Sequence, residues 1–146
     1  MEDPSGRVDF GSRIHSILAE IRESSEIEEA LQRALLSGTL SLQEEKQIRK
    51  MLNEVVFHPE LARYFDVAVT VKNEPEILEM QGEASRPDRV VFDGDEVVVI
   101  DYKTGRKSRT HHQQIERYGC LLQEMGYQNV RKLLVYLGGE VEVEEV

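Results

Sequence analysis

Two aspartates and a lysine lie close together in the most apolar part of the sequence. Asp88 lies in the segment RPDRVV, and Asp101 and Lys103 lie in VVVIDYKTG. The β-branched residues around them predict two strands, and the dipeptide Asp93-Gly94 between these strands predicts a tight hairpin turn. In such a hairpin the start of the first strand lies beside the end of the second, so the two carboxylates can converge.

The three side chains form a set that can bind a divalent cation. Two carboxylates at one place repel each other unless a cation neutralises them, and hard oxygen ligands select Mg²⁺ or Mn²⁺ over Zn²⁺. Lys103 follows Asp101 by two residues and therefore points to the same face of its strand. A metal, two acids and a lysine can activate a water and stabilise a phosphoryl transition state, which indicates phosphodiester hydrolysis. The alternative for a bare D-x-K tripeptide is an ordinary salt bridge at a strand end.

The first part of the chain has the pattern of helices. Apolar residues recur at the spacing of one buried helical face over residues 14–21 and again over residues 27–35. Serine-to-glutamate capping boxes at Ser25 and Ser41 predict where the second and third helices begin, and the third helix is expected over about residues 42–57.

From Asp66 onward the pattern changes to that of strands. The segments DVAVTVK, EPEILEMQ, RVVF and EVVVIDY predict a meander of three or four strands. A helix is expected from about Arg109 to Met125 with Gly126 as its stop, followed by a strand at VRKLLVYLG and an edge strand or frayed tail at VEVEEV. The predicted fold is therefore α/β or α+β, a mixed sheet of about four to five strands flanked by helices, with a helical N-terminal third.

Length and composition limit the class of protein. The 146 residues fit one domain, with a helical part over 1–65 and a sheet core over 66–146. The single cysteine, Cys120, excludes an internal disulfide and a CxxC zinc site and favours a reducing cytoplasm. No apolar run approaches the roughly 20 residues that cross a bilayer, and the start MEDPSGRVDF is too acidic for a signal peptide. We therefore expect a soluble cytoplasmic protein without a membrane partner.

The net charge of -10 argues against a surface that holds DNA by electrostatics alone. The segment that follows Asp101 is nevertheless basic, because it carries Arg106, Lys107 and Arg109. These side chains would suit phosphate contacts, and a solvated basic turn or a docking surface for a larger partner is the alternative.

The order of these motifs resembles the PD-(D/E)XK nuclease superfamily, and VIDYKTG followed by QIERY is similar to its RecB-type branch. That branch includes the C-terminal nuclease domains of RecB-like and AddA-like helicase-nucleases. The resemblance covers about residues 10–137 and implies a restriction-endonuclease-like core. The residues that would carry its motifs are, in chain order, His15, Glu74, Asp88, Asp101 with Lys103, and Gln114 with Tyr118.

The resemblance also implies a role for each residue of the site. His15, Asp88 and Asp101 would be metal ligands, and the backbone carbonyl of Tyr102 would be a further one, for Mg²⁺ or Mn²⁺. Lys103 would position the nucleophilic water and offset the developing charge. For His15, a buried or boundary residue of an amphipathic helix is the alternative.

Other positions keep two interpretations. Glu74 is the preferred acid on the strand before the hairpin, although Glu76 shares its face and either could be a solvated acid. Gln114 and Tyr118 are one helical turn apart and can jointly reach the site or the DNA, whereas core packing is an equal alternative for Tyr118. The pair His111-His112 is interpreted as exposed residues at a helix start.

The sequence therefore predicts a magnesium-dependent deoxyribonuclease that acts exonucleolytically on DNA ends or single strands. By resemblance it would be the C-terminal module of a RecB/AddA-like DNA-repair and recombination helicase-nuclease, with the motor outside this chain. One alternative is a catalytically inactive DNA-binding or subunit-docking module of the same fold, against which the retention of Asp88, Asp101 and Lys103 argues. The other is a restriction-type endonuclease, which the Q-x-x-x-Y motif and the lack of a target-recognition segment disfavour.

Overall fold

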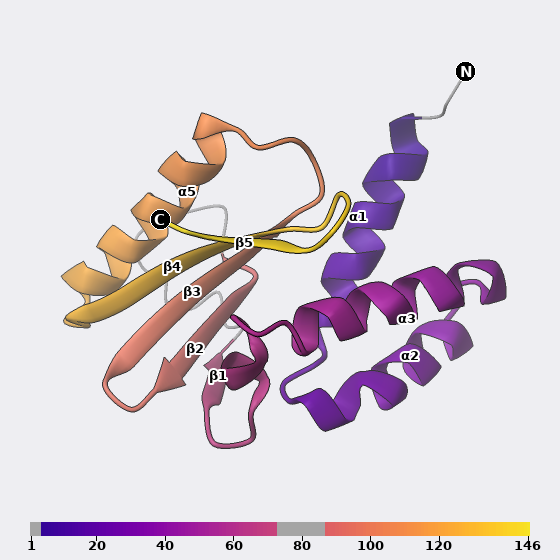
Figure 1. The fold of residues 1–146 in the computed structure, drawn as a ribbon, viewed down its shortest axis with the longest axis horizontal. Coiled ribbons are helices and arrows are strands. Elements are labelled where there is room, and N and C mark those ends of the chain that lie inside the picture. Colours follow the sequence, from indigo (N-terminus) through magenta and orange to yellow (C-terminus); the bar gives the residue numbers. More distant parts are fainter. Residues whose placement is uncertain (1–3, 73–86) are drawn as a thin grey trace. The chain divides into compact units, whose positions relative to one another are not determined.

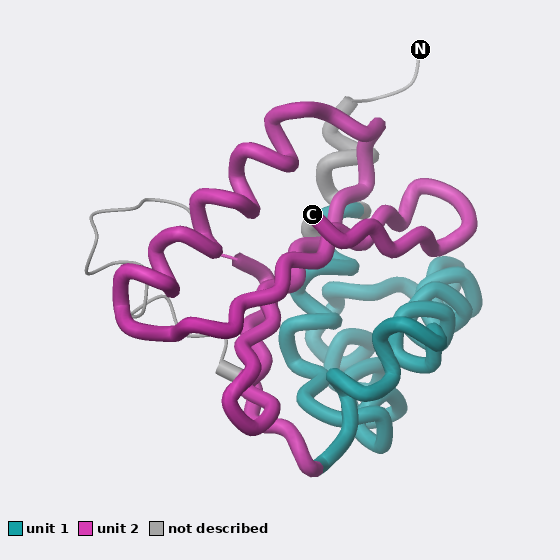
Figure 2. The backbone as a smooth tube through the Cα atoms, turned by 60° about the vertical axis from the view of Figure 1, so that its left-hand side comes forward, with its two compact units in different colours: residues 1–67 teal, residues 68–146 magenta. Residues whose placement is uncertain are grey.

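The computed structural model describes residues 4–72 and 87–146 (Figure 1). The chain divides into two compact units, residues 1–67 and residues 68–146, which are coloured separately in Figure 2. This division does not test the prediction of a single domain, which stays a prediction. None of the helices in the described ranges combines the length and apolar composition that crossing a membrane requires.

The first unit is helical, as the sequence predicts. Its elements are α1 (Pro4–Ala19), the short 3-10 helix η1 (Ser24–Glu26), α2 (Ile27–Leu36), α3 (Leu42–Val56) and the 3-10 helix η2 (Ala62–Phe65). The apolar residues with helical spacing are buried, among them Ile14, Leu18, Ile27, Leu31, Ile48 and Leu52. Burial of one face of each helix is what the spacing predicts, and it stabilises helices that are too short to persist alone.

The two predicted helix starts have different outcomes. Ser41 caps α3 as predicted, because its hydroxyl accepts from the Glu44 N–H at 3.3 Å and the Glu44 carboxylate accepts from the Ser41 N–H at 3.3 Å. The capping box predicted at Ser25 is wrong. Glu23 caps the preceding 3-10 turn together with Glu26, and the Ser25 hydroxyl donates to the Glu23 carboxylate at 2.8 Å instead.

The second unit is a five-stranded mixed sheet with a helix against it. Its elements are β1 (Thr70–Lys72), β2 (Arg89–Asp93), β3 (Glu96–Lys103), α5 (Arg109–Glu124), β4 (Asn129–Tyr136) and β5 (Glu142–Glu145). The strands lie in the order β1-β2-β3-β4-β5; β3 and β4 are parallel and every other neighbouring pair is antiparallel. The predicted edge strand at the C-terminal segment is therefore present, whereas the segment EPEILEMQ lies outside the described residues.

The hairpin between β2 and β3 differs by one residue from the predicted turn. Asp93 pairs with Glu96 as the last pair of the ladder, so the two loop residues are Gly94 and Asp95. Gly94 has a φ of 64°, the left-handed conformation that a primed two-residue turn needs at its first position. Glycine adopts it without a steric penalty, and this fixes the register of β2 against β3.

The helix α5 connects the parallel strands β3 and β4 and covers one face of the sheet (Figure 1). Its apolar residues pack with the strands in one core cluster that includes Val90, Val97, Val99, Ile115, Leu122 and Leu134. The helix ends where predicted, since Gly126 has a φ of 106° directly after the cap residue Met125. The predicted α/β class is thus confirmed, and the mixed sheet is consistent with a restriction-endonuclease-like core.

Candidate active site

Asp88 and Asp101 lie at the open end of the β2–β3 hairpin, where each carboxylate accepts a backbone N–H from the other strand. The Asp88 N–H donates to Oδ1 of Asp101 at 2.9 Å, and the Tyr102 N–H donates to Oδ2 of Asp88 at 2.8 Å. These bonds continue the strand pairing beyond its last ladder pair, Arg89 with Ile100. The structure therefore brings together the two carboxylates that the hairpin pattern places side by side.

Lys103 lies on the same face of β3 as Asp101. Its ammonium nitrogen is 3.4 Å from Oδ2 of Asp101 and donates to the side-chain oxygen of Gln114 at 2.6 Å. The Lys103 side chain is 19% exposed and the Asp101 side chain 4% exposed, so the pair is largely shielded from solvent. Gln114 on α5 and Asp101 on β3 thus position the Lys103 ammonium group from two different elements.

The burial of Asp101 and the negative charge of Asp88 beside it favour a bound cation at this place. The pKa of Asp101 is raised to about 6, by burial first and by the charge of Asp88 next, against the opposing effects of Lys103 and the Asp88 N–H. One lysine therefore does not balance two carboxylates in this environment. A divalent cation would supply the missing positive charge.

The donor set fits a hard divalent cation. Two carboxylates that converge at one point are oxygen ligands of the kind that Mg²⁺ takes while it keeps several of its own waters. Within the described residues no group of three or more acidic, histidine or cysteine side chains meets at one place. Asp88, Asp101 and water would be the ligands there. Glu74, the acid predicted on the strand before the hairpin, lies outside the described residues.

The side chain of Tyr102 points away from this site, because neighbouring residues on a strand face opposite sides. It is buried, and burial raises the pKa of the Tyr102 phenol far above its ordinary value. The phenol therefore stays neutral and is not an anionic ligand. The backbone carbonyl of Tyr102 remains the predicted ligand atom.

Gln114 and Tyr118, which were predicted to act as a pair, lie in different environments. Gln114 lies at the site through its bond to Lys103. Tyr118 is 1% exposed and belongs to the apolar cluster of α5 and the sheet. This environment favours the core-packing interpretation of Tyr118, and its catalytic role stays a prediction.

His15 lies in α1, in the helical unit. Its Nδ1 is 2.6 Å from the backbone oxygen of Gly11, one turn earlier in the helix. A ring that donates through Nδ1 carries its lone pair on Nε2, which is the tautomer of a metal-binding histidine whose second nitrogen is held by the backbone. The local geometry suits a ligand, and the predicted metal contact of His15 stays a prediction.

The predicted phosphate-binding side chains are partly neutralised within their own unit. Lys107 pairs with Glu142 of β5 at 2.7 Å, whereas Arg106 and Arg109 are exposed. The prediction that His111 and His112 are simply exposed is wrong, because both are partly buried by contacts with β4 and β5.

The contacts that β4 and β5 make with α5 were not expected from the sequence. His112 pairs with Glu144 at 2.7 Å, and the His111 ring lies against Tyr136 with 5.9 Å between ring centroids. Glu142, Glu144 and Tyr136 come from β4 and β5. Their approach to α5 depends on a parallel pairing across a helix, for which no local pattern in the sequence is a signal.

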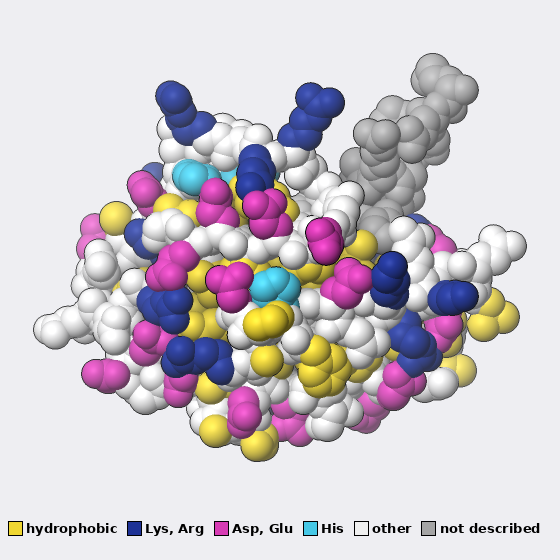
Figure 3. Space-filling model, in the orientation of Figure 1, with side chains coloured by type: hydrophobic (Ala, Val, Ile, Leu, Met, Phe, Trp, Pro, Cys, Tyr) yellow, Lys and Arg dark blue, Asp and Glu magenta, His cyan; other side chains and the backbone are white. Residues whose placement is uncertain are grey.

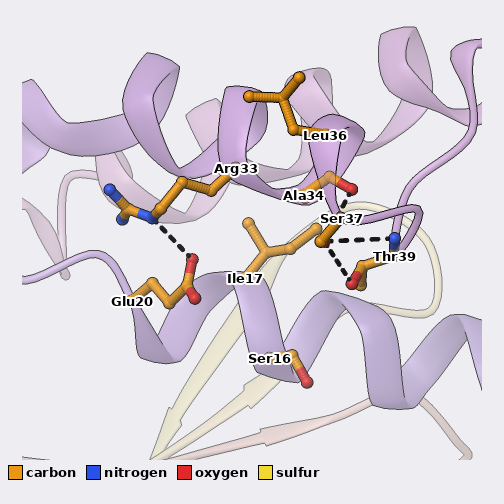
Figure 4. Close-up of a pocket in the computed structure, with 8 residues that line it drawn as sticks. All are labelled: Ser16, Ile17, Glu20, Arg33, Ala34, Leu36, Ser37 and Thr39. Carbon is orange, nitrogen blue, oxygen red and sulfur yellow. Dashed lines mark hydrogen bonds and ion pairs between the residues drawn. The ribbon is translucent and has the colours of Figure 1, made fainter.

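A cavity of about 480 Å³ lies in the helical unit, between α1, α2 and the turn after α2 (Figure 4). Glu20 and Arg33 form an ion pair of 3.4 Å at one end, and Ser37 and Thr39 are hydrogen-bonded to each other at the other end. These four polar side chains of the lining thus bind one another in pairs, and the cavity contains none of the predicted site residues.

Comparison with known families matches residues 1–145 to the family model described as the PD-(D/E)XK nuclease superfamily. The match concerns the superfamily as a whole and leaves the RecB-type branch an expectation. No curated protein matches the chain.

Proposed function

The chain belongs to the PD-(D/E)XK nuclease superfamily, and on this basis we propose that it is a metal-dependent deoxyribonuclease that hydrolyses phosphodiester bonds at the Asp88, Asp101 and Lys103 site. The observation that carries the proposal is a pair of aspartates whose carboxylates each accept a backbone N–H across the hairpin, with the Lys103 ammonium group 3.4 Å from Oδ2 of Asp101. Membership of the family gives the class of reaction, and these contacts supply the groups that the reaction needs.

Each group of the site has a task in this proposal. Asp88 and Asp101 would hold Mg²⁺ or Mn²⁺, which when bound would supply a Lewis acid for the phosphate and for the attacking water. Lys103 orients that water and offsets the negative charge that develops on the phosphoryl oxygens. Gln114 is a positioning residue, because its side-chain oxygen holds the Lys103 ammonium group at 2.6 Å.

We further propose that the substrate is a DNA end or a single strand and that digestion is exonucleolytic. The chain would be the nuclease module of a RecB/AddA-like helicase-nuclease in DNA repair and recombination, with a helicase domain or subunit as its partner. The free, exposed Cys120 supports a reducing compartment such as the cytoplasm.

The second candidate is a catalytically inactive DNA-binding or docking module of the same fold. Its support is electrostatic: the net charge is -10, and acidic and basic side chains are interspersed on the face shown in Figure 3. Such a surface gives little general attraction for DNA, so a partner that delivers the strand to the site would be needed.

Labelled linear DNA, single- or double-stranded, incubated with Mg²⁺ or Mn²⁺ tests the proposal. Lys103→Ala should reduce the cleavage rate by about 100- to 1,000-fold, as expected for loss of one preorganised charge at a transition state. Lys50→Ala is the matched control, because Lys50 is exposed on α3.

The results separate the candidates. Equal degradation by the wild-type chain and by Lys103→Ala would contradict the assignment of the site. Absence of cleavage by the wild-type chain, with DNA still bound, would favour the inactive module.

A further inference from the structure

His111, in the first turn of α5, presents an imidazole ring that is backed by a second ring. The centroids of the His111 and Tyr136 rings are 5.9 Å apart with an angle of 44° between their planes, and the Tyr136 hydroxyl is 3.5 Å from Nδ1 of His111. Tyr136 is 5% exposed and His111 is only partly buried. Tyr136 is therefore the support, and His111 is the ring that a ligand can reach.

This ring pair lies beside the proposed catalytic lysine. Tyr136 is the register partner of Lys103 in the parallel pair of β3 and β4, so the two side chains lie on one face of adjacent strands. Neighbouring strands are about 4.8 Å apart. The charge of Lys103 is the second cause, next to burial, of the lowered pKa of His111. The two side chains are therefore near each other.

Lys107 adds a positive charge near the Tyr136 ring, where Glu142 pairs with it at 2.7 Å. Its ammonium nitrogen is 5.4 Å from the centroid of the Tyr136 ring, within the range of a cation–π contact. The pKa of His111 is lowered by burial first and then by the charges of Lys103 and His112, so the imidazole is neutral at neutral pH. A neutral ring is better suited to an uncharged, flat group than to a phosphate.

A single-stranded nucleotide has the matching chemistry. Proteins bind single strands by stacking bases on aromatic side chains while positive side chains follow the phosphates on either side. Here Lys103 and Lys107 are the positive groups, and His111 is the ring near them. Tyr136 keeps the ring from turning away, since its hydroxyl and its ring both contact it.

We propose that His111, supported by Tyr136, stacks on the nucleobase next to the scissile phosphodiester of a single DNA strand, with Lys107 against the neighbouring phosphate. This inference rests on the proposed nuclease function, because it assigns that site a single-stranded substrate. It gives His111 a task that the sequence pattern alone does not indicate.

The test uses the full chain carrying Asp101→Asn, so that cleavage does not consume the strand. Short single strands with 2-aminopurine at successive positions are titrated in the presence of Mg²⁺, and fluorescence quenching reports stacking. We expect quenching at one or two adjacent positions. His111→Ala should abolish it and weaken binding by about 5- to 150-fold, the value of one base stacked on an aromatic ring.

Three further variants make the result specific. His111→Phe keeps a flat ring and should retain the quenching, and His112→Ala is the matched control because His112 pairs with Glu144 at a half-exposed position. Lys107→Ala should keep the quenching and lower the slope of log affinity against log salt by about 0.7, whereas His111→Ala should leave that slope unchanged.

The proposal is overturned if His111→Ala retains the quenching, if His111→Phe loses as much as His111→Ala, or if the parent chain binds no single strand. Melting temperatures of the variants show whether a variant has lost only the stacking contact or has also lost its fold. If the wild-type chain cleaves no DNA while quenching still depends on His111, the nuclease function fails and the stacking contact stands.

Discussion

Replacing Asp101 with asparagine should stabilise the metal-free protein at neutral pH. Burial raises the pKa of Asp101 to about 6 from its ordinary value of 3.8, with the charge of Asp88 as the next cause. The folded chain therefore holds this proton more tightly than the unfolded chain does. The stabilisation that comes from the protonated form is present below pH 3.8 and is lost as the pH rises through about 6.

The size of the effect follows from the two pKa values. Their difference corresponds to about 3 kcal/mol at about 1.4 kcal/mol per pH unit. Asparagine keeps an oxygen that can accept from the Asp88 N–H, now at 2.9 Å, but loses the attraction of the carboxylate to Lys103 at 3.4 Å. We therefore expect a gain in the free energy of unfolding of about 1 to 3 kcal/mol at pH 7.

Urea denaturation of the wild-type chain and of Asp101→Asn in EDTA, from about pH 4.5 to 8, measures this gain. The difference between the two chains should grow as the pH rises through 6 and then level off. With Mg²⁺ at 100 times its Kd the wild-type chain should gain about 2.7 kcal/mol, and the variant much less. Asp95→Asn, an exposed acid in the loop of the same hairpin, is the control.

Two results would refute this reasoning. One is a variant that is less stable than the wild-type chain at pH 7 in EDTA, since the charged carboxylate would then be stabilising. The other is a stability difference that does not change across the pH range, because the pKa of Asp101 would then not be raised in the folded chain.

Two further predictions concern an ion pair and a helix cap. Glu142→Gln should remove the carboxylate that competes with the phosphate for Lys107, now 2.7 Å away, and tighten single-strand binding by about 2- to 5-fold, whereas Glu140→Gln should not; unchanged binding by Glu142→Gln would contradict this. Ser41→Ala should lower the free energy of unfolding by about 1 kcal/mol because it removes the cap of α3. Ser25→Ala, measured in the same urea titrations, should change it far less, and equal losses would exclude capping as the cause.

Local patterns were sufficient for most of the fold. Helical spacing predicts the buried faces of α1, α2 and α3, and β-branched runs predict β2 and β3. The contact between Asp88 and Asp101 is also predictable from a short segment. Once the position of the hairpin turn is known, it determines that these two residues, 13 apart in the chain, lie side by side. One error is local too: Ser25 has the motif of a cap, but the glutamates beside it form a 3-10 turn first.

The sequence by itself therefore determined the type of each element, the hairpin and the set of Asp88, Asp101 and Lys103, since each depends on residues close in the chain. The tertiary structure alone decided what surrounds that set. Parallel pairing of β3 with β4 brings Tyr136 beside Lys103, and packing of α5 brings Gln114 and His111 there. The same packing buries Asp101 and raises its pKa. Register across a connecting helix and burial by distant elements depend on the whole packed unit, so no short segment encodes them.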